Sequence, residues 1–315
     1  MIRMVVSDMD GTLLNKKAEI TDGNLKAIRC LEENHIEFVI ASGRDYRGVY
    51  TVIGRYGIEC EAILGNGSQY VDRRGELLMS CYMKKEVVPD IVRIFQGLKI
   101  PHMIFATDGF FTADEPEEVR RAFMERSCSR FGRGEEDFDR GGKYEYLPCN
   151  QLQKIEDFDG FLRHDREIMK VEAFTTPCGE RAAGEQQLRE YELSGGEMSD
   201  VRTINRAKEQ LKEIPGISFL SSFEDNVEVT DKDAQKGYIL DKVIRQKGLS
   251  RGEVAVVGDG MNDLSMFEIF PDSYAPSNAQ ETIKEMAGEI VSSNEEDGFA
   301  RAVDRILAKN LAAAK

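Results

Sequence analysis

The sequence predicts an α/β fold, in which a Rossmann-like parallel sheet carries an inserted α+β domain. Short apolar runs alternate with helical patterns over residues 1–67, the order expected of parallel strands joined by right-handed crossovers. The same alternation resumes near residue 231. Between these stretches the strand patterns are of the antiparallel type, with helices among them. We therefore expect a core of residues 1–83 and 231–315 and an inserted domain of residues 84–230.

Length, charge and cysteine spacing limit the class of protein. At 315 residues the chain can bury the cores of two domains. A net charge of -15 makes nucleic acid and anionic membranes poor partners, although a local metal ion can still attract a phosphorylated molecule. None of the six cysteines forms a C-x-x-C pair, and no apolar run is long enough to cross a bilayer. With no secretory signal, a cytoplasmic protein is expected.

The first predicted strand ends in two carboxylates. Residues 2–7 form a short, mostly apolar run, and Asp8 and Asp10 follow it. Ligands of open α/β sheets bind beyond the carboxyl ends of the strands, where both side chains would lie. Burying two carboxylates there is costly, and a bound metal ion is the usual compensation. A lone acid would simply end a strand, but here Gly11 permits a tight turn and Thr12 supplies a hydroxyl.

The next elements lead to a second polar strand end. Thr21 is expected to cap a helix that runs to about Asn34, and a strand over residues 36–41 follows. Ser42 and Gly43 come directly after this strand. Ser42 can cap the next helix, or its hydroxyl and the Gly43 amide can bind a phosphate oxygen at the helix N-terminus. The two interpretations are compatible.

Apolar spacing and turn residues predict the remaining elements. In chain order we expect a helix with Val49 and Tyr56 on its apolar face, a strand at 62–64, a hairpin over 69–82, a helix from about 84 to 98, strands near 103–105 and 107–111, a helix near 116–128, a loop over 132–143, a strand at 168–174, helices near 180–193 and 203–213, strands at 217–222 and 227–230, and a closing helix over 299–307.

Two features after residue 230 complete the pattern. Asp233 is expected to cap a helix with Lys236 in its first turn. A lysine there is most often solvated, but it can also point toward the carboxylates. The buried strand over residues 253–257 ends in a glycine-rich acidic loop. Asp259 at this strand end and Asp263 in the first turn of the next helix can face the same cavity as the first two aspartates.

These four stretches, taken in order, resemble the four motifs of the haloacid dehalogenase (HAD) phosphohydrolase superfamily. Asp8-Met9-Asp10-Gly11-Thr12 is similar to motif I, Ser42-Gly43-Arg44 to motif II, Lys236-Gly237 to motif III, and Gly258-Asp259 through Asn262-Asp263 to motif IV. With an insertion between motifs II and III, the chain resembles the Cof-type subfamily, whose core carries a type IIB cap. Pro276 and Ser277 depart from the small residues that the family has before Asn278.

The resemblance implies a Mg²⁺-dependent phosphatase of small phosphorylated metabolites, such as sugar phosphates, acting through an aspartyl-phosphate. Asp8 would be the nucleophile and Asp10 the general acid and base. Ser42, Gly43, Lys236 and Asn262 would hold the phosphate, and Asp8, the backbone carbonyl of Asp10, Asp259 and Asp263 would hold Mg²⁺. The cap would select the substrate, and a monomer or weak homodimer is expected.

Two alternatives stay open. A phosphosugar mutase shares the first half-reaction but transfers the phosphoryl group to a second sugar hydroxyl. A non-catalytic regulator would use the same scaffold only to bind phosphate or metal, although every catalytic position is intact in this sequence.

Overall fold

The chain forms an α/β fold made of two compact units. The computed structural model describes residues 1–131, 147–176 and 199–314, so the loop expected over 132–143 and the helix expected near 180–193 lie outside the described residues. The first unit joins Met1–Cys81 to Asp233–Lys315, and the second is Tyr82–Lys232. Each boundary lies two residues from the expected one.

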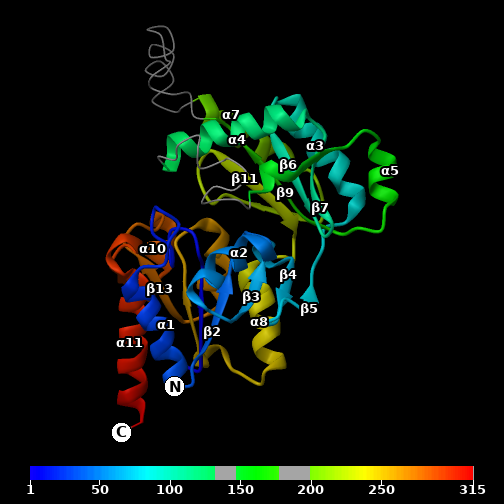
Figure 1. Ribbon diagram of the computed structural model, residues 1–315. Helices are drawn as coiled ribbons and strands as arrows, with labels where there is room; N and C mark the ends of the chain where they lie inside the picture. Colours follow the sequence, from blue (N-terminus) through cyan, green and yellow to red (C-terminus); the bar gives the residue numbers. More distant parts are fainter. Residues whose placement is uncertain (132–146, 177–198, 315) are drawn as a thin grey trace, which may run out of the picture. The chain divides into compact units, whose positions relative to one another are not determined.

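The first unit is built on a mixed sheet. Within the described residues its strands run in the order β14-β13-β12-β1-β2-β3-β4-β5, parallel up to β3 and antiparallel beyond it (Figure 1). Every residue of β1 and β12 is buried, as expected of central strands that are covered on both faces. The strands are β1 Met4–Ser7, β2 Glu37–Ala41, β3 Glu61–Leu64, β4 Gln69–Val71, β5 Leu77–Ser80, β12 Val254–Val257, β13 Asp272–Pro276 and β14 Glu289–Val291.

Helices cover both faces of this sheet. On one face, Ile239 of α8 and Met266 of α9 belong to the same core cluster as Val6 and Val256. On the other face α1 and α11 lie side by side, the blue and red helices of Figure 1. The helices of this unit are α1 Asp22–Glu33, α2 Tyr46–Ile53, α8 Lys236–Gln246, α9 Leu264–Ile269, α10 Glu281–Met286 and α11 Gly298–Ala313. The three layers leave the loops at the carboxyl ends of the parallel strands on one edge of the unit.

The second unit has its own sheet, with strand order β10-β11-β9-β6-β7-β8 in the described part of the chain. The pairing is antiparallel except between β7 and β8. The strands are β6 His102–Ala106, β7 Gly109–Thr112, β8 Leu152–Lys154, β9 Ile168–Phe174, β10 Ile217–Leu220 and β11 Asn226–Asp231. Helices α3 Val88–Gly97, α5 Phe158–Arg163 and α7 Ser199–Leu211 pack on one face, and α4 Pro116–Phe131 packs against the other.

Two predicted helix caps are wrong. Asp45, rather than Ser42, caps α2, because its Oδ1 accepts the backbone N–H of Gly48 at 3.2 Å. Helix α8 begins after Gln235, so Asp233 lies outside the cap position. In α2 two capping residues precede the helix, and the backbone path selects Asp45. In α8 the cap position falls on Gln235, which makes no side-chain capping bond.

Other elements follow the expected pattern with local differences. Thr21 caps α1 as predicted, and its Oγ1 accepts the N–H of Asn24 at 3.2 Å. Strand β8 and helix α5 were not predicted; they are short, with three and six residues. Helix α11 extends past residue 307 to Ala313, because its alanine-rich end has high helix propensity.

The close approach of α8 and α9 depends on Gly237. A Cβ atom there would lie 2.2 Å from the backbone oxygen of Ser265. We therefore expect Gly237→Ala to lower the free energy of unfolding by about 1–3 kcal/mol, as overpacking does in cores. Urea denaturation would measure this. The matched control is Gly252→Ala, whose methyl group would meet nothing within 4 Å and should change stability by less than about 0.5 kcal/mol. Equal losses would contradict the packing argument.

Candidate active site

Asp8 lies at the carboxyl end of the central strand β1. Its backbone N–H donates to the carbonyl of Val257 in β12 at 2.9 Å, which extends the pairing of the two strands by one residue. The residue is only 5% exposed. The sheet therefore places the Asp8 carboxylate beside the loop that follows β12.

Asp259 and Asp263 lie in that loop. Asp263 Oδ2 accepts the backbone N–H groups of Asp259 at 3.0 Å and Gly260 at 3.1 Å, which fixes the loop conformation. Thr12 Oγ1 donates to Asp259 Oδ1 at 2.7 Å and so joins the two acidic loops. Gly11 has a φ of 84°, and a Cβ atom there would lie 2.3 Å from Asp259 Oδ2. A side chain at this position would displace the carboxylate.

Lys236 is a buried bridge between the aspartates. It is the first residue of α8 and is 0% exposed, so it is not the solvated lysine that its position alone would suggest. Its Nζ lies 2.5 Å from Asp8 Oδ1 and 2.6 Å from Asp263 Oδ1. The structure therefore brings Asp8, Asp263 and Lys236 together, with Asp259 at the same place through its own loop.

The charges of this cluster do not balance, because three carboxylates face one ammonium group. Burial raises the pKa of Asp8 well above its ordinary value, and the Lys236 ammonium opposes this only in part. Burial, followed by the carboxylate of Asp263, raises the pKa of Asp259 to about 7. The two carboxylates that contact Lys236 raise its pKa even though burial acts in the opposite direction. A divalent cation would offset the excess negative charge.

The donor atoms suit a magnesium ion. One carboxylate oxygen from each of Asp8, Asp259 and Asp263 lies within 4.8 Å of the others, and hard oxygen donors are what Mg²⁺ prefers. Both oxygens of Asp263 already accept hydrogen bonds. Among the described hydrogen bonds, Oδ2 of Asp8 and Oδ2 of Asp259 are not used. The residues present therefore fit a cation held directly by Asp8 and Asp259, with Asp263 acting through water.

The carboxylate of Asp10 lies apart from this cluster and pairs with Arg44. Arg44 Nε donates to Asp10 Oδ2 at 2.7 Å and Nη2 donates to Oδ1 at 2.6 Å. Sequence reasoning gave Arg44 no role, although it directly follows Ser42 and Gly43. The signal that could have found it is an arginine, with its fork of donors, beside a strand end that neighbours two acids.

Ser42 and Asn262 are connected through Asn66. The N–H of Asn66 donates to the Ser42 carbonyl at 3.0 Å, and Asn262 Nδ2 donates to Asn66 Oδ1 at 3.2 Å. Asn66 has a φ of 60°, a left-handed conformation that asparagine tolerates. Ser42 and Asn262 are buried and Gly43 is half-buried. The loop after β2 is thus attached to the acidic loop, while phosphate binding by Ser42, Gly43 and Asn262 stays a prediction.

Asn278 fastens the turn that follows β1. Its Nδ2 donates to the carbonyl of Gly11 at 2.8 Å, and its Oδ1 accepts the N–H of Asn294 at 2.8 Å. The departure at Pro276 and Ser277 has therefore not removed the asparagine from the neighbourhood of the site.

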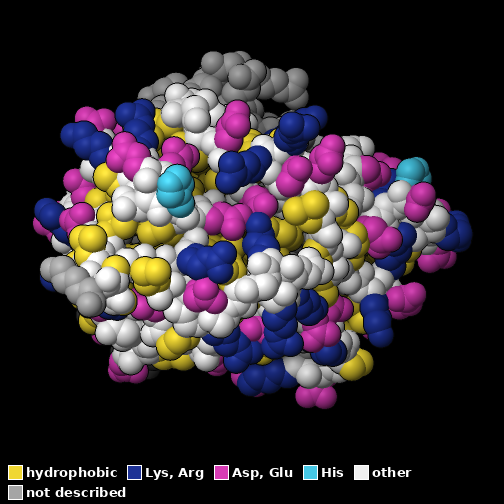
Figure 2. Space-filling model, turned by 90° about the horizontal axis from the view of Figure 1, so that it is seen from below, with side chains coloured by type: hydrophobic (Ala, Val, Ile, Leu, Met, Phe, Trp, Pro, Cys, Tyr) yellow, Lys and Arg dark blue, Asp and Glu magenta, His cyan; other side chains and the backbone are white. Residues whose placement is uncertain are grey.

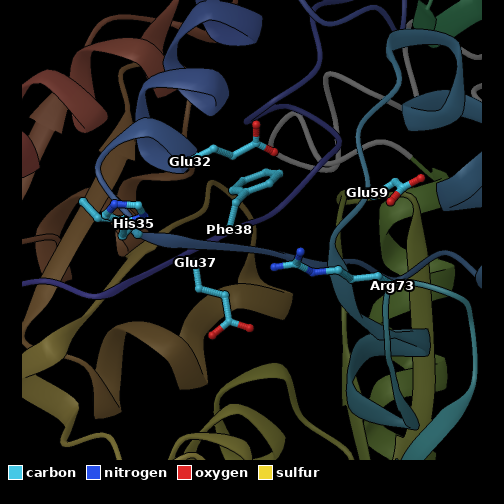
Figure 3. Close-up of a pocket in the computed structure, with 7 residues that line it drawn as sticks. Glu32, His35, Glu37, Phe38, Glu59 and Arg73 are labelled. Carbon is cyan, nitrogen blue, oxygen red and sulfur yellow. The ribbon is translucent and has the colours of Figure 1, made fainter.

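A surface pocket of about 590 Å³ lies at the other end of the strands. Its lining comes from the end of α1, the amino ends of β2 and β3 and the β4–β5 turn, and comprises Glu32, His35, Ile36, Glu37, Phe38, Glu59 and Arg73. In Figure 3 the Arg73 side chain extends toward Phe38. The pocket is separate from the aspartates, which lie at the carboxyl ends. On the face seen in Figure 2, acidic and basic side chains are intermixed.

Comparison with known proteins identifies the family. A model of the haloacid dehalogenase-like hydrolases matches residues 5–176 and 191–303. The chain belongs to this family. The phosphatase YwpJ of Bacillus subtilis is 24% identical over 306 residues, which cover 97% of this chain and 100% of YwpJ. The 5-amino-6-(5-phospho-D-ribitylamino)uracil phosphatase YwtE of the same organism is also 24% identical over 306 residues, covering 97% of this chain and 98% of YwtE.

A solved structure agrees with this assignment. A HAD subclass IIB sugar phosphatase has a TM-score of 0.69 at 18% identity, covering 96% of this chain and 98% of its own. The predicted fold class is therefore confirmed, and the chain is a hydrolase of the phosphoric monoester class. Over the described residues, every helix is too short or too polar to span a membrane.

We expect Mg²⁺ to stabilise the folded chain through Asp259. At a free concentration one hundred times its Kd, a ligand that binds only the folded state adds about 2.7 kcal/mol. Thermal unfolding with Mg²⁺ and with EDTA should therefore differ for the wild type and differ much less for Asp259→Asn. Asp304→Asn, which removes an exposed acid of α11, is the control and should keep the full Mg²⁺ response. An undiminished response in Asp259→Asn would remove that residue from the metal site.

Proposed function

We propose that the protein is a Mg²⁺-dependent phosphatase of small phosphorylated metabolites that acts through an aspartyl-phosphate on Asp8. The observation that carries this proposal is the position of Asp8. Its carboxylate is buried at the end of the central strand, held at Oδ1 by Lys236 and adjacent to Asp259, so that Oδ2 has a fixed direction. A fixed and desolvated carboxylate is suited to attack on phosphorus.

In the first half-reaction, one oxygen of the Asp8 carboxylate attacks the phosphorus atom of the substrate in line with the ester oxygen, while the other oxygen would remain available to the metal ion. The bond from phosphorus to that oxygen breaks as the new bond to Asp8 forms. Asp10 donates its proton to the departing oxygen, which leaves as an alcohol. Lys236 balances part of the negative charge around the nucleophile, because its ammonium already contacts Asp8 and Asp263.

In the second half-reaction, water attacks the phosphorus of the aspartyl-phosphate. Asp10 accepts a proton from this water, and the bond between phosphorus and Asp8 breaks to release inorganic phosphate and restore both aspartates. A bound Mg²⁺ would lower the repulsion between the Asp8 carboxylate and the phosphate dianion. Ser42, Gly43 and Asn262 are proposed to hold the phosphate oxygens, and the Asp10 backbone carbonyl to complete the metal site.

The names of two relatives support the proposed substrate class. The names of YwtE and the subclass IIB phosphatase refer to a phosphorylated ribitylaminouracil and to sugar phosphates. We infer a small phosphomonoester for this chain, selected by the unit Tyr82–Lys232 acting as a cap. A cytoplasmic location and a monomer or weak homodimer stay predictions.

The experiment that tests the function is phosphate release from a panel of phosphorylated metabolites, with Mg²⁺ and with EDTA. We expect turnover with Mg²⁺ and its loss with EDTA. Transfer of phosphate between two sugar phosphates without release would identify a mutase. Binding without turnover of any compound, p-nitrophenyl phosphate included, would identify a regulator.

Asp8→Asn should abolish turnover while the fold is kept, because the amide has the same shape but is a poor nucleophile. We expect a loss of at least about a thousandfold, or on the order of 4 kcal/mol in the activation barrier. Steady-state phosphate release, with circular dichroism as the check on folding, would measure it. Turnover within tenfold of the wild type would rule out Asp8 as the nucleophile.

A further inference from the structure

The pairing of Asp10 with Arg44 separates this aspartate from the other three. Both carboxylate oxygens of Asp10 are engaged by one guanidinium group, at 2.6 Å and 2.7 Å. The Asp10 side chain is 49% exposed and that of Arg44 is 26% exposed, whereas Asp8 and Asp263 are buried. Asp10 thus lies on the solvent side of the cluster, where a leaving alcohol and an incoming water would be.

Arg44 is itself held in place. Its Nη1 donates to the carbonyl of Gly48 in the first turn of α2 at 3.1 Å. Its backbone N–H donates to Ser42 Oγ at 3.2 Å, and its carbonyl accepts the N–H of Gly65 at 2.9 Å. The two loop contacts hold the backbone of Arg44, and the contact with Gly48 orients its guanidinium group. An aligned, two-point ion pair transfers that orientation to the Asp10 carboxylate.

We propose that Arg44 is the positioning residue for Asp10, holding the carboxylate away from the metal cluster and aimed at the leaving oxygen. This inference rests on the proposed function, because it gives Arg44 a role in the proton transfers of that reaction. The arginine acts through Asp10 and does not bind the transferring phosphate. The geometry favours this reading, since Nε and Nη2, the paired edge that would grip a phosphate, are occupied by the carboxylate.

The proposal predicts a dependence on the leaving group. An aliphatic alkoxide is a poor leaving group that needs a proton from a positioned acid, and such general acid catalysis contributes about 10²–10⁴-fold. p-Nitrophenolate leaves as a stable anion and needs no proton. Arg44→Gln should therefore lower kcat for glucose 6-phosphate by at least about tenfold, within that range. The rate of p-nitrophenolate release in the first turnover, measured by rapid mixing, should change by less than about threefold.

A double-mutant cycle on glucose 6-phosphate separates the two roles of Arg44. If Arg44 acts through Asp10, adding Arg44→Gln to Asp10→Asn should lower kcat no further than Asp10→Asn alone, within about threefold. If Arg44 instead binds the phosphate, its loss should raise KM for both substrates and add in full to the Asp10→Asn effect. The second pattern would overturn the proposal.

Further variants distinguish a loss of positioning from a loss of folding. Arg44→Lys keeps the positive charge but not the two-point fork, and we expect a kcat between those of the wild type and Arg44→Gln. Arg29→Gln removes an exposed arginine of α1 and should leave both substrates unaffected. A uniform loss in Arg44→Gln for both substrates, with a lower Tm, would assign Arg44 a purely structural role and refute the proposal. No turnover by the wild type with Mg²⁺ of any compound in the panel would instead refute the proposed function.

Discussion

The rest of the active site depends on the ammonium group of Lys236, which lies between Asp8 and Asp263. Three carboxylates gathered in a largely buried place would repel one another, and a buried charge that loses its partner typically costs 3–5 kcal/mol, roughly. The lysine makes the arrangement possible by contacting two of them. It can do so because it begins α8, and because Gly237 lets that helix approach α9. The negative charge that remains after this pairing would attract a metal ion.

The sequence predicted the elements that follow strong patterns. The strands before Asp8 and Asp259 are apolar runs with abrupt acidic ends, so the sequence predicts both that they are strands and where they end. It also predicts that the two ends meet, because parallel neighbours in a sheet end on the same edge. The resemblance to a family motif predicted that Lys236 lies near the acids. The structure adds its contacts with Asp8 and Asp263, which sequence spacing alone does not predict.

What the sequence did not predict depends on the path of the backbone. Capping by Asp45 rather than Ser42 is decided by the turn after β2, which no local pattern specifies. Arg44 is a partly exposed arginine in a loop. Its place after the second strand end was a signal for a role near the acids, but only the position of Asp10 in space identifies its partner. Strand β8 was missed because it is short and pairs at the edge of its sheet, where packing leaves little trace in the sequence.

The pairing of β1 with β12 also has a consequence for synthesis. Ser7 pairs with Val257, so one side of the central strand finds its neighbour only after the entire inserted unit has been made. At the ribosome, a gap of this length corresponds to a delay on the order of tens of seconds. During that time the nucleophile already exists on the nascent chain, but the strand that carries it has an open edge. The catalytic centre can therefore form only late in the synthesis of the chain, after β12 and the loop that follows it have been made.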